Sequence, residues 1–170
     1  HRHRVEHCGI CPPEIAKRLG AAGIVVVAQP GFIYEHGERY LHSVEANKQG
    51  WLHPLRTLAR GGLRVALGSD APVAPPDPIV AIAAAVTRKT MYGARVNVGE
   101  AVDVETAIRL HTESSAYAAG DEHLKGRIAP GQLADLVVID PDPLSGELDA
   151  ISEAKVLTTV VGGRIAYERS

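Results

Sequence analysis

Residues 23–30 read Gly-Ile-Val-Val-Val-Ala-Gln-Pro, and this stretch decides the fold class. The run Ile24 to Ala28 is wholly apolar and rich in β-branched residues. A short run of this kind is typical of a strand that is buried on both faces, as in a parallel sheet. Leu63 to Leu67 is a second run of the same character.

Helical patterns separate the predicted strands. The chain opens with a segment at 1–7 that is predicted to be extended. Helices are predicted at 12–19, 54–60, 77–88 and 103–119, from proline or aspartate at their starts and glycine near their ends. Strands that alternate with helices pair in parallel through right-handed crossovers. The sequence therefore predicts an α/β fold, either a doubly wound sheet or part of a (β/α) barrel.

The sequence pattern changes after residue 126. Runs at 136–139, 156–161 and 165–167 have strand character, and Val161-Gly162-Gly163-Arg164 is a hairpin turn signal. This pattern favours antiparallel pairing. We therefore predict two segments, 1–126 and 127–170, with the boundary near Gly126 to Gly131.

Composition excludes several functions. The chain has 170 residues, with 18 Lys and Arg against 20 Asp and Glu, so no basic patch predicts nucleic-acid binding. The longest apolar run, Ile79 to Val86, is far shorter than the roughly 18 residues that cross a bilayer, so no membrane span is predicted. Two cysteines cannot form a disulfide framework, which favours a reducing, cytoplasmic compartment.

Polar residues follow three predicted strands. His7, Gln29 and Asp70 each come after a strand, and in parallel α/β folds the carboxyl ends of strands carry the functional site. Neutral imidazole and carboxylate are good ligands for Zn²⁺ and can also act as an acid and base pair. The alternative is that His7 is an ordinary polar strand residue and Asp70 merely caps its loop.

Aromatic residues gather just after the second strand. Phe32, Tyr34, Tyr40 and Trp51 lie between Gly31 and Trp51, in what we predict to be a long loop. Such a loop is typical of a substrate pocket wall. We therefore predict Gln29, Phe32, Tyr34 and Trp51 as substrate-binding residues, the alternative being a packed surface loop.

Cys8 and Cys11 supply a rival hypothesis. A C-x-x-C sequence between a strand and a helix is also where thiol–disulfide oxidoreductases carry their redox pair. However, Pro12-Pro13 follows directly, so Cys11 precedes the helix instead of lying in its first turn. A third hypothesis is a non-catalytic α/β module.

Four motifs together resemble a known family. Arg4 to Cys8, Ala28 to Pro30, Gly68 to Val73 and Pro130 to Asp140 are similar, in this order, to the last barrel strands and the return segment of the amidohydrolase superfamily. The resemblance is to its N-substituted formamide deformylase-like branch, amidohydrolase family 3. It implies that His7 is a metal ligand on the sixth strand. It implies that Asp70, on the eighth, is a metal ligand or the base that activates water.

The chain departs from the family pattern because its first predicted strand corresponds to the sixth strand of the family's barrel. The metal-binding H-x-H of the first strand, the Lys or Glu of the fourth and the His of the fifth have no counterpart, and His1-Arg2-His3 is not a substitute. A (β/α)₈ barrel usually takes about 250 residues. The resemblance thus implies the C-terminal portion of a (β/α)₈ TIM barrel followed by strands of a small β-sandwich.

The implied function is metal-dependent hydrolysis of carbon–nitrogen bonds in non-peptide amides or formamides. The implied cofactor is a divalent metal, most simply Zn²⁺, with one or two ions in the intact enzyme. The expected partners are a small-molecule amide, the missing N-terminal part of the barrel and a second copy in a homo-oligomer. We further expect that the apolar runs 24–28 and 63–67 are left uncovered, so that the chain alone is inactive and self-associates.

Overall fold

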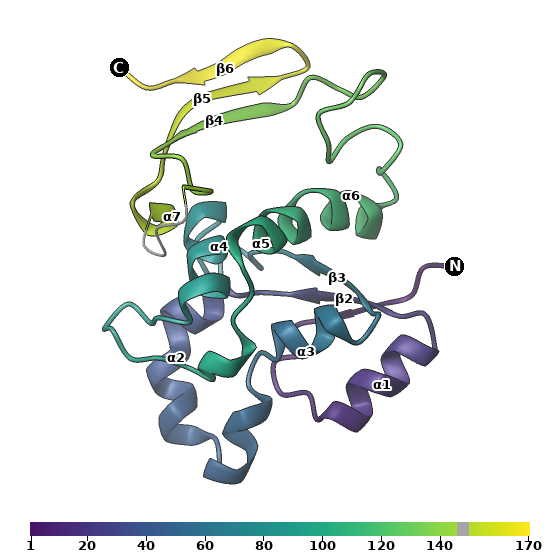
Figure 1. Cartoon of the computed structure of the whole chain (residues 1–170), viewed down its shortest axis with the longest axis vertical. Coiled ribbons are helices and arrows are strands. Elements are labelled where there is room, and N and C mark those ends of the chain that lie inside the picture. Colours follow the sequence, from purple (N-terminus) through teal and green to yellow (C-terminus); the bar gives the residue numbers. More distant parts are fainter. Residues whose placement is uncertain (146–149) are drawn as a thin grey trace.

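The computed structural model describes residues 1–145 and 150–170, which form two three-stranded sheets connected by helices (Figure 1). The strands are β1 (Arg4–Glu6), β2 (Val25–Ala28), β3 (Arg64–Leu67), β4 (Leu136–Asp140), β5 (Lys155–Val161) and β6 (Arg164–Glu168). The α-helices are α1 (Pro13–Ala21), α2 (Gly31–Ser43), α3 (Leu55–Arg60), α4 (Pro78–Thr87), α5 (Val104–His111), α6 (Glu113–Ala119) and α7 (Ala150–Glu153). Two short 3₁₀ helices are η1 (Ala46–Trp51) and η2 (Val98–Glu100).

The first sheet is parallel, in the order β1-β2-β3, as the alternating pattern predicts. Val26 pairs with Val5 on one side and with Val65 on the other. Figure 1 shows α5 and α6 on one side of this sheet and α1 and α3 on the other. The sheet therefore lies inside a helix–sheet–helix arrangement.

The expectation that the apolar runs of this sheet stay uncovered is wrong. Neighbouring residues of a strand point to opposite faces, and both members of such pairs are buried. Val25 and Val26 are 2% and 0% exposed, and Val65 and Ala66 are 2% and 1% exposed. The reason is that α5 and α6 pack against β3 on one side of the sheet and α3 packs against it on the other, so the chain covers both faces itself.

The expected loop at 31–51 is also wrong, because it forms α2 and η1. Phe32, His36 and Tyr40 are four residues apart, the spacing that places side chains on one face of a helix. Gly37 does not break this helix. Its missing side chain admits Thr90, which an added Cβ would strike.

Aspartates cap two helices where the sequence predicts them. The Asp77 carboxylate accepts from the backbone N–H of Ile79 at 2.8 Å, and that of Asp103 accepts from Thr106 at 2.7 Å. Each pairing satisfies a backbone donor that a helix start leaves free. No helix among the described residues is long and apolar enough to cross a lipid bilayer.

The second sheet is antiparallel, in the order β4-β5-β6, with the predicted hairpin between β5 and β6. Apolar side chains of this sheet are open to solvent: Val137 is 55% exposed, Val161 56% and Ile165 63%. Unlike the first sheet, it lacks cover from the rest of the described chain on much of its surface.

The predicted segment 127–170 contributes to the first core. It contains residues 146–149, which lie outside the described residues. Directly after them, α7 contacts α4, and Ile151 is 0% exposed in the same apolar cluster as Val26 and Val65. The division at residue 126 stays a prediction.

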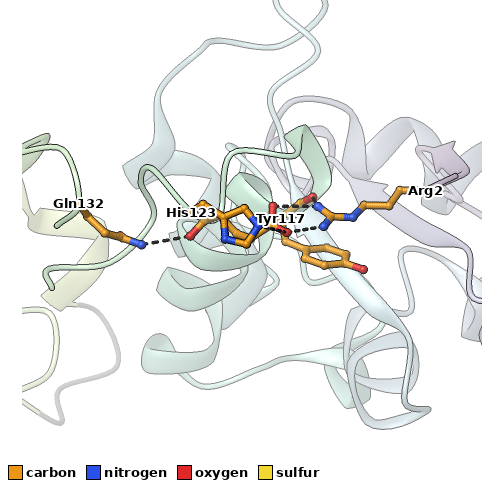
Figure 2. A network of polar contacts seen from close by, with 5 residues as sticks. Arg2, Tyr117, His123 and Gln132 are labelled. Atoms are coloured by element: carbon orange, nitrogen blue, oxygen red, sulfur yellow. Dashed lines mark hydrogen bonds and ion pairs between the residues drawn. The ribbon is translucent and has the colours of Figure 1, made fainter. Parts of the chain in front are cut away.

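A polar network ties the amino-terminal segment to α6 (Figure 2). Arg2 donates to the carbonyl of Tyr117 at 2.7 Å and to the carboxylate of Glu122 at 2.8 Å. The guanidinium groups of Arg2 and Arg64 lie 3.9 and 4.1 Å from the centre of the Tyr117 ring. The hydrogen bond from Arg2 lowers the pKa of Glu122 to about 2. Because Arg2 precedes β1 and Arg64 begins β3, this network lies at the amino end of the sheet.

Candidate functional site

The carboxyl ends of the three parallel strands bring His7 and Asp70 to one edge of the sheet. The backbone N–H of His7 donates to Val27 at 2.8 Å, and that of Gly68 donates to Ala28 at 3.0 Å, so both flank the end of β2. His7 and Gly68 are therefore two strand spacings apart, which is roughly 10 Å. Asp70 follows Gly68 by two residues, and both His7 and Asp70 are exposed. The two side chains therefore lie on the same edge of the sheet, at the ends of its two outer strands.

Gln29 orients the ring of His7. The Nδ1 atom of His7 lies 3.0 Å from Oε1 of Gln29, while Nε2 of Gln29 donates to the carbonyl of Val27 at 3.0 Å. The hydrogen bond to Val27 fixes the orientation of the Gln29 amide. The amide oxygen of Gln29 therefore faces the His7 ring, and Nδ1 of His7 carries the proton. The lone pair of His7 then resides on Nε2. Gln29, a predicted substrate-binding residue, lies behind His7, and this residue is only 3% exposed.

Strained backbone gathers around this edge. His7, Cys8, His53, Asp70 and Arg88 have φ angles of 67°, 50°, 42°, 58° and 58°. Non-glycine residues rarely adopt positive φ, and each such residue costs of order 1–3 kcal/mol. Strain of this kind concentrates at functional sites, where the surrounding structure holds it in place.

A row of rings runs from the strand edge along α2. Ring centroids are 5.8 Å apart for His7 and Phe32 and 5.7 Å apart for Phe32 and His36. The row continues at 6.3 Å to Tyr40 and at 5.4 Å from Tyr40 to His53. Phe32 is stacked on His7 at an interplanar angle of 19°, so it supports the imidazole from one side.

The predicted substrate-binding aromatics do not share one wall. Phe32 and Tyr34 are two residues apart, which on a helix places them on different faces. Tyr34 lines a cavity with Ile79 and Val80 of α4. Trp51 ends η1, where its carbonyl accepts from the backbone N–H of Cys11 at 3.1 Å. The structure thus brings Phe32, but neither Tyr34 nor Trp51, into ring contact with His7.

His53 and Arg88 are site residues that the sequence reasoning missed. They line one small cavity together with His7 and Cys8. Arg88 is 0% exposed and His53 is 7% exposed, so both are buried polar side chains close to the strand edge. Burial, and after it the charge of Arg88, lowers the pKa of His53 to about 4. His53 follows the predicted aromatic segment, but nothing in the sequence singles out Arg88.

Cys11 lacks the properties of a redox thiol. It is 1% exposed, and burial, followed by its hydrogen bond with Cys8, raises its pKa to about 12. The thiolate is the reactive form, so a thiol with a raised pKa is inert. The two cysteines are free, not joined in a disulfide.

Mild oxidation should leave Cys8 and Cys11 as free thiols, because Cys11 is buried and its raised pKa keeps it in the unreactive thiol form. The measurement is a count of free thiols by alkylation and mass spectrometry, before and after the oxidation. A disulfide that forms readily between the two residues would contradict this expectation.

Within the described ranges, no three His, Cys, Asp or Glu residues lie close enough together to hold a metal ion. His7 offers Nε2, and Asp70 offers a carboxylate with no hydrogen-bond partner in the described part of the chain. A catalytic zinc site takes about three protein ligands. The described residues therefore provide two candidate donors, and a complete site needs more.

Comparison with known proteins gives a consistent answer. The model of the Amidohydrolase family matches residues 1–167. The chain is 35% identical over 168 residues to N-substituted formamide deformylase of Arthrobacter pascens, covering 98% of this chain and 31% of the relative. It is 32% identical over 173 residues to the putative amidohydrolase YtcJ of Bacillus subtilis, covering 99% of this chain and 33% of the relative. The chain thus spans about a third of the length of these curated relatives.

A solved structure supports the same relationship. The fold superimposes with a TM-score of 0.72 on an uncharacterized metal-dependent hydrolase from Pyrococcus furiosus, at 29% identity. That match covers 84% of this chain and 29% of the other. Since the family model matches nearly every residue, the chain belongs to the amidohydrolase family.

Proposed function

We propose that this chain supplies part of the active site of a metal-dependent hydrolase of carbon–nitrogen bonds. The observation that carries the proposal is the hydrogen bond between Nδ1 of His7 and the buried amide of Gln29. A metal-binding histidine characteristically uses its second nitrogen in this way, since the bond fixes the ring and the tautomer.

The proposed architecture is a (β/α)₈ barrel to which β1, β2 and β3 contribute three strands. Further strands would then supply the remaining metal ligands, because three protein ligands are the usual minimum for catalysis. We propose that the second sheet belongs to a β-sandwich whose other strands cover its exposed apolar side chains, such as Val137 and Ile165. Pairing with a second copy is the alternative cover. Residence in the cytoplasm stays a prediction.

The two candidate donors fit a divalent metal. Neutral imidazole and carboxylate together suit Zn²⁺, the ion that we propose, as one or two ions. His7 would hold it through Nε2 and Asp70 through its carboxylate. When bound, a metal of this kind lowers the pKa of water and polarises a carbonyl.

The protein's own residues would perform the proton transfers. Asp70 is exposed at the strand edge, where its carboxylate can take a proton from the attacking water and pass it to the leaving nitrogen. Gln29 holds His7 in one orientation, and Phe32 stacks against the ring. Among the described residues, Asp70 is thus the group that we propose to move the proton.

The substrate class that we propose is a small non-peptide amide, of the formamide type. Its support is the relative named N-substituted formamide deformylase, at 35% identity. Phe32, which we predict to bind substrate, stacks on the ring of His7 at the strand edge. A thiol oxidoreductase or a non-catalytic module would need no metal, so metal binding separates the proposal from both.

Metal affinity of the intact protein tests the proposal. We expect stoichiometric zinc by mass spectrometry, and its loss when His7 is replaced by alanine. Gln29→Leu should weaken zinc binding about tenfold in competition with a chromophoric chelator, because it frees the imidazole without removing a ligand. His42→Ala is the matched control, since His42 is exposed on α2 away from the strand edge. Wild-type affinity in the His7 variant would overturn the proposal.

A further inference from the structure

A small cavity lies behind the strand edge. Its volume is about 10 Å³, and its walls include the apolar side chains of Ile33, Leu55 and Leu58. Its polar walls come from His7, His53 and Arg88. A cavity of this size has room for one water molecule and for no larger ligand.

Arg88 enters this cavity with one end of its guanidinium unpaired. Nε donates to the carbonyl of Val96 at 3.0 Å, and Nη2 donates to that of Leu52 at 3.2 Å. Nη1 is buried and has no hydrogen-bond partner among the described residues. An unsatisfied cationic donor at 0% exposure is costly, so an acceptor is required there.

His53 presents the complementary atom. Its Nδ1 is likewise buried and lacks a partner within the described part of the chain. Arg88 bonds to the carbonyl of Leu52, the residue that precedes His53, so the two side chains are neighbours. Burial lowers the pKa of His53 to about 4, and its imidazole is therefore neutral at pH 7. A neutral imidazole can accept a hydrogen bond at Nδ1.

We propose that one water molecule occupies this cavity, accepting from Nη1 of Arg88 and donating to Nδ1 of His53. The three groups then form a brace, by which we mean Arg88, the water and His53. The brace places the His53 proton on Nε2, because Nδ1 serves as the acceptor. It also satisfies both buried polar atoms at once.

The brace supports the loop that carries His7. The backbone N–H of His53 donates to the carbonyl of Gly9 at 2.8 Å. The ring also packs against that residue, since a Cβ on Gly9 would lie 3.5 Å from Cε1 of His53. His7 and Cys8, which directly precede Gly9, have positive φ and depend on such external support. Arg88 is thus a positioning residue for His7, a role that rests on the proposed function.

The tautomer of His53 tests the water site without any activity. The experiment is ¹⁵N-histidine NMR of the intact wild-type protein at pH 7, with resonances assigned by single substitution. We expect one tautomer for His53, protonated on Nε2, with Nδ1 in a hydrogen bond. Protonation on Nδ1, or a mixture of tautomers, would overturn the proposal.

Zinc affinity tests the positioning role. Arg88→Met should weaken zinc binding about tenfold in the intact protein, the usual scale for a residue that orients a metal ligand. Arg88→Lys keeps the positive charge and a hydrogen-bond donor, so it should weaken zinc binding less than Arg88→Met does. Arg39→Met is the matched control, because Arg39 is an exposed arginine on α2. A folded Arg88→Met variant with wild-type zinc affinity would overturn the positioning role.

The two proposals fail in different ways. If the wild-type protein binds no divalent metal, the proposed function fails, and the His53 tautomer still decides whether the water site exists. If zinc binds but His53 carries its proton on Nδ1, the brace fails and the proposed function stands.

Discussion

Asp70→Asn should lower the rate of amide hydrolysis at least about 100-fold, the lower end of the range for a lost general base. Asparagine has nearly the same shape but cannot take a proton from the attacking water. Since Asp70 is exposed and its carboxylate has no hydrogen-bond partner in the described chain, the substitution should leave the thermal midpoint almost unchanged. The measurement is kcat per bound metal on a formamide substrate.

The control for this experiment is Asp142→Asn. Asp142 is an exposed aspartate that accepts from the backbone N–H of Leu144 at 2.9 Å, a role that asparagine preserves. It should retain the full rate. An Asp70 variant that keeps more than half of the activity would show that another group moves the proton.

Acidification from pH 7 to pH 4 should destabilise the protein, and His53 should account for about 3 kcal/mol of the loss in unfolding free energy. Burial lowers the pKa of His53 from 6.5 to about 4 in the folded state. Between these values the unfolded chain binds the proton more readily than the folded protein does. The His53 contribution is therefore complete above pH 6.5 and falls as the pH approaches 4.

Urea unfolding at pH 7 and pH 4 measures this effect. His53→Gln removes the titrating group, so its unfolding free energy should fall less between the two pH values. His42→Gln is the control, because His42 is exposed. Equal pH dependence in the wild-type and His53→Gln proteins would contradict the expectation.

The first sheet was predictable because its strands are short apolar runs between helix signals. Ile24 to Ala28 and Leu63 to Leu67 fall within a residue of β2 and β3. The α2 helix was not predicted, because the aromatic residues that follow the second strand were interpreted as a pocket-lining loop. What the sequence could not show is that Gly37 gives room to Thr90, which lies 53 positions away.

Half of the candidate site followed from the rule that parallel strands end at one edge. That rule places His7, Gln29 and Asp70 at one edge of the sheet, where Gln29 contacts His7, and the role of Gln29 at the substrate stays a prediction. His53 and Arg88 could not be predicted, because they meet only when α4 packs behind the strand edge. Their cavity depends on tertiary distances that no local pattern encodes.

The left-handed backbone at the strand edge carries a consequence for protein engineering. Glycine adopts positive φ freely, so glycine at Asp70, whose carboxylate has no hydrogen-bond partner in the described part of the chain, should relieve strain and raise the melting temperature. The same exchange would remove the carboxylate that we propose as the proton acceptor. A search for thermostable variants would therefore enrich glycine at a position where the proposed chemistry needs a side chain, which is a trade-off between stability and activity.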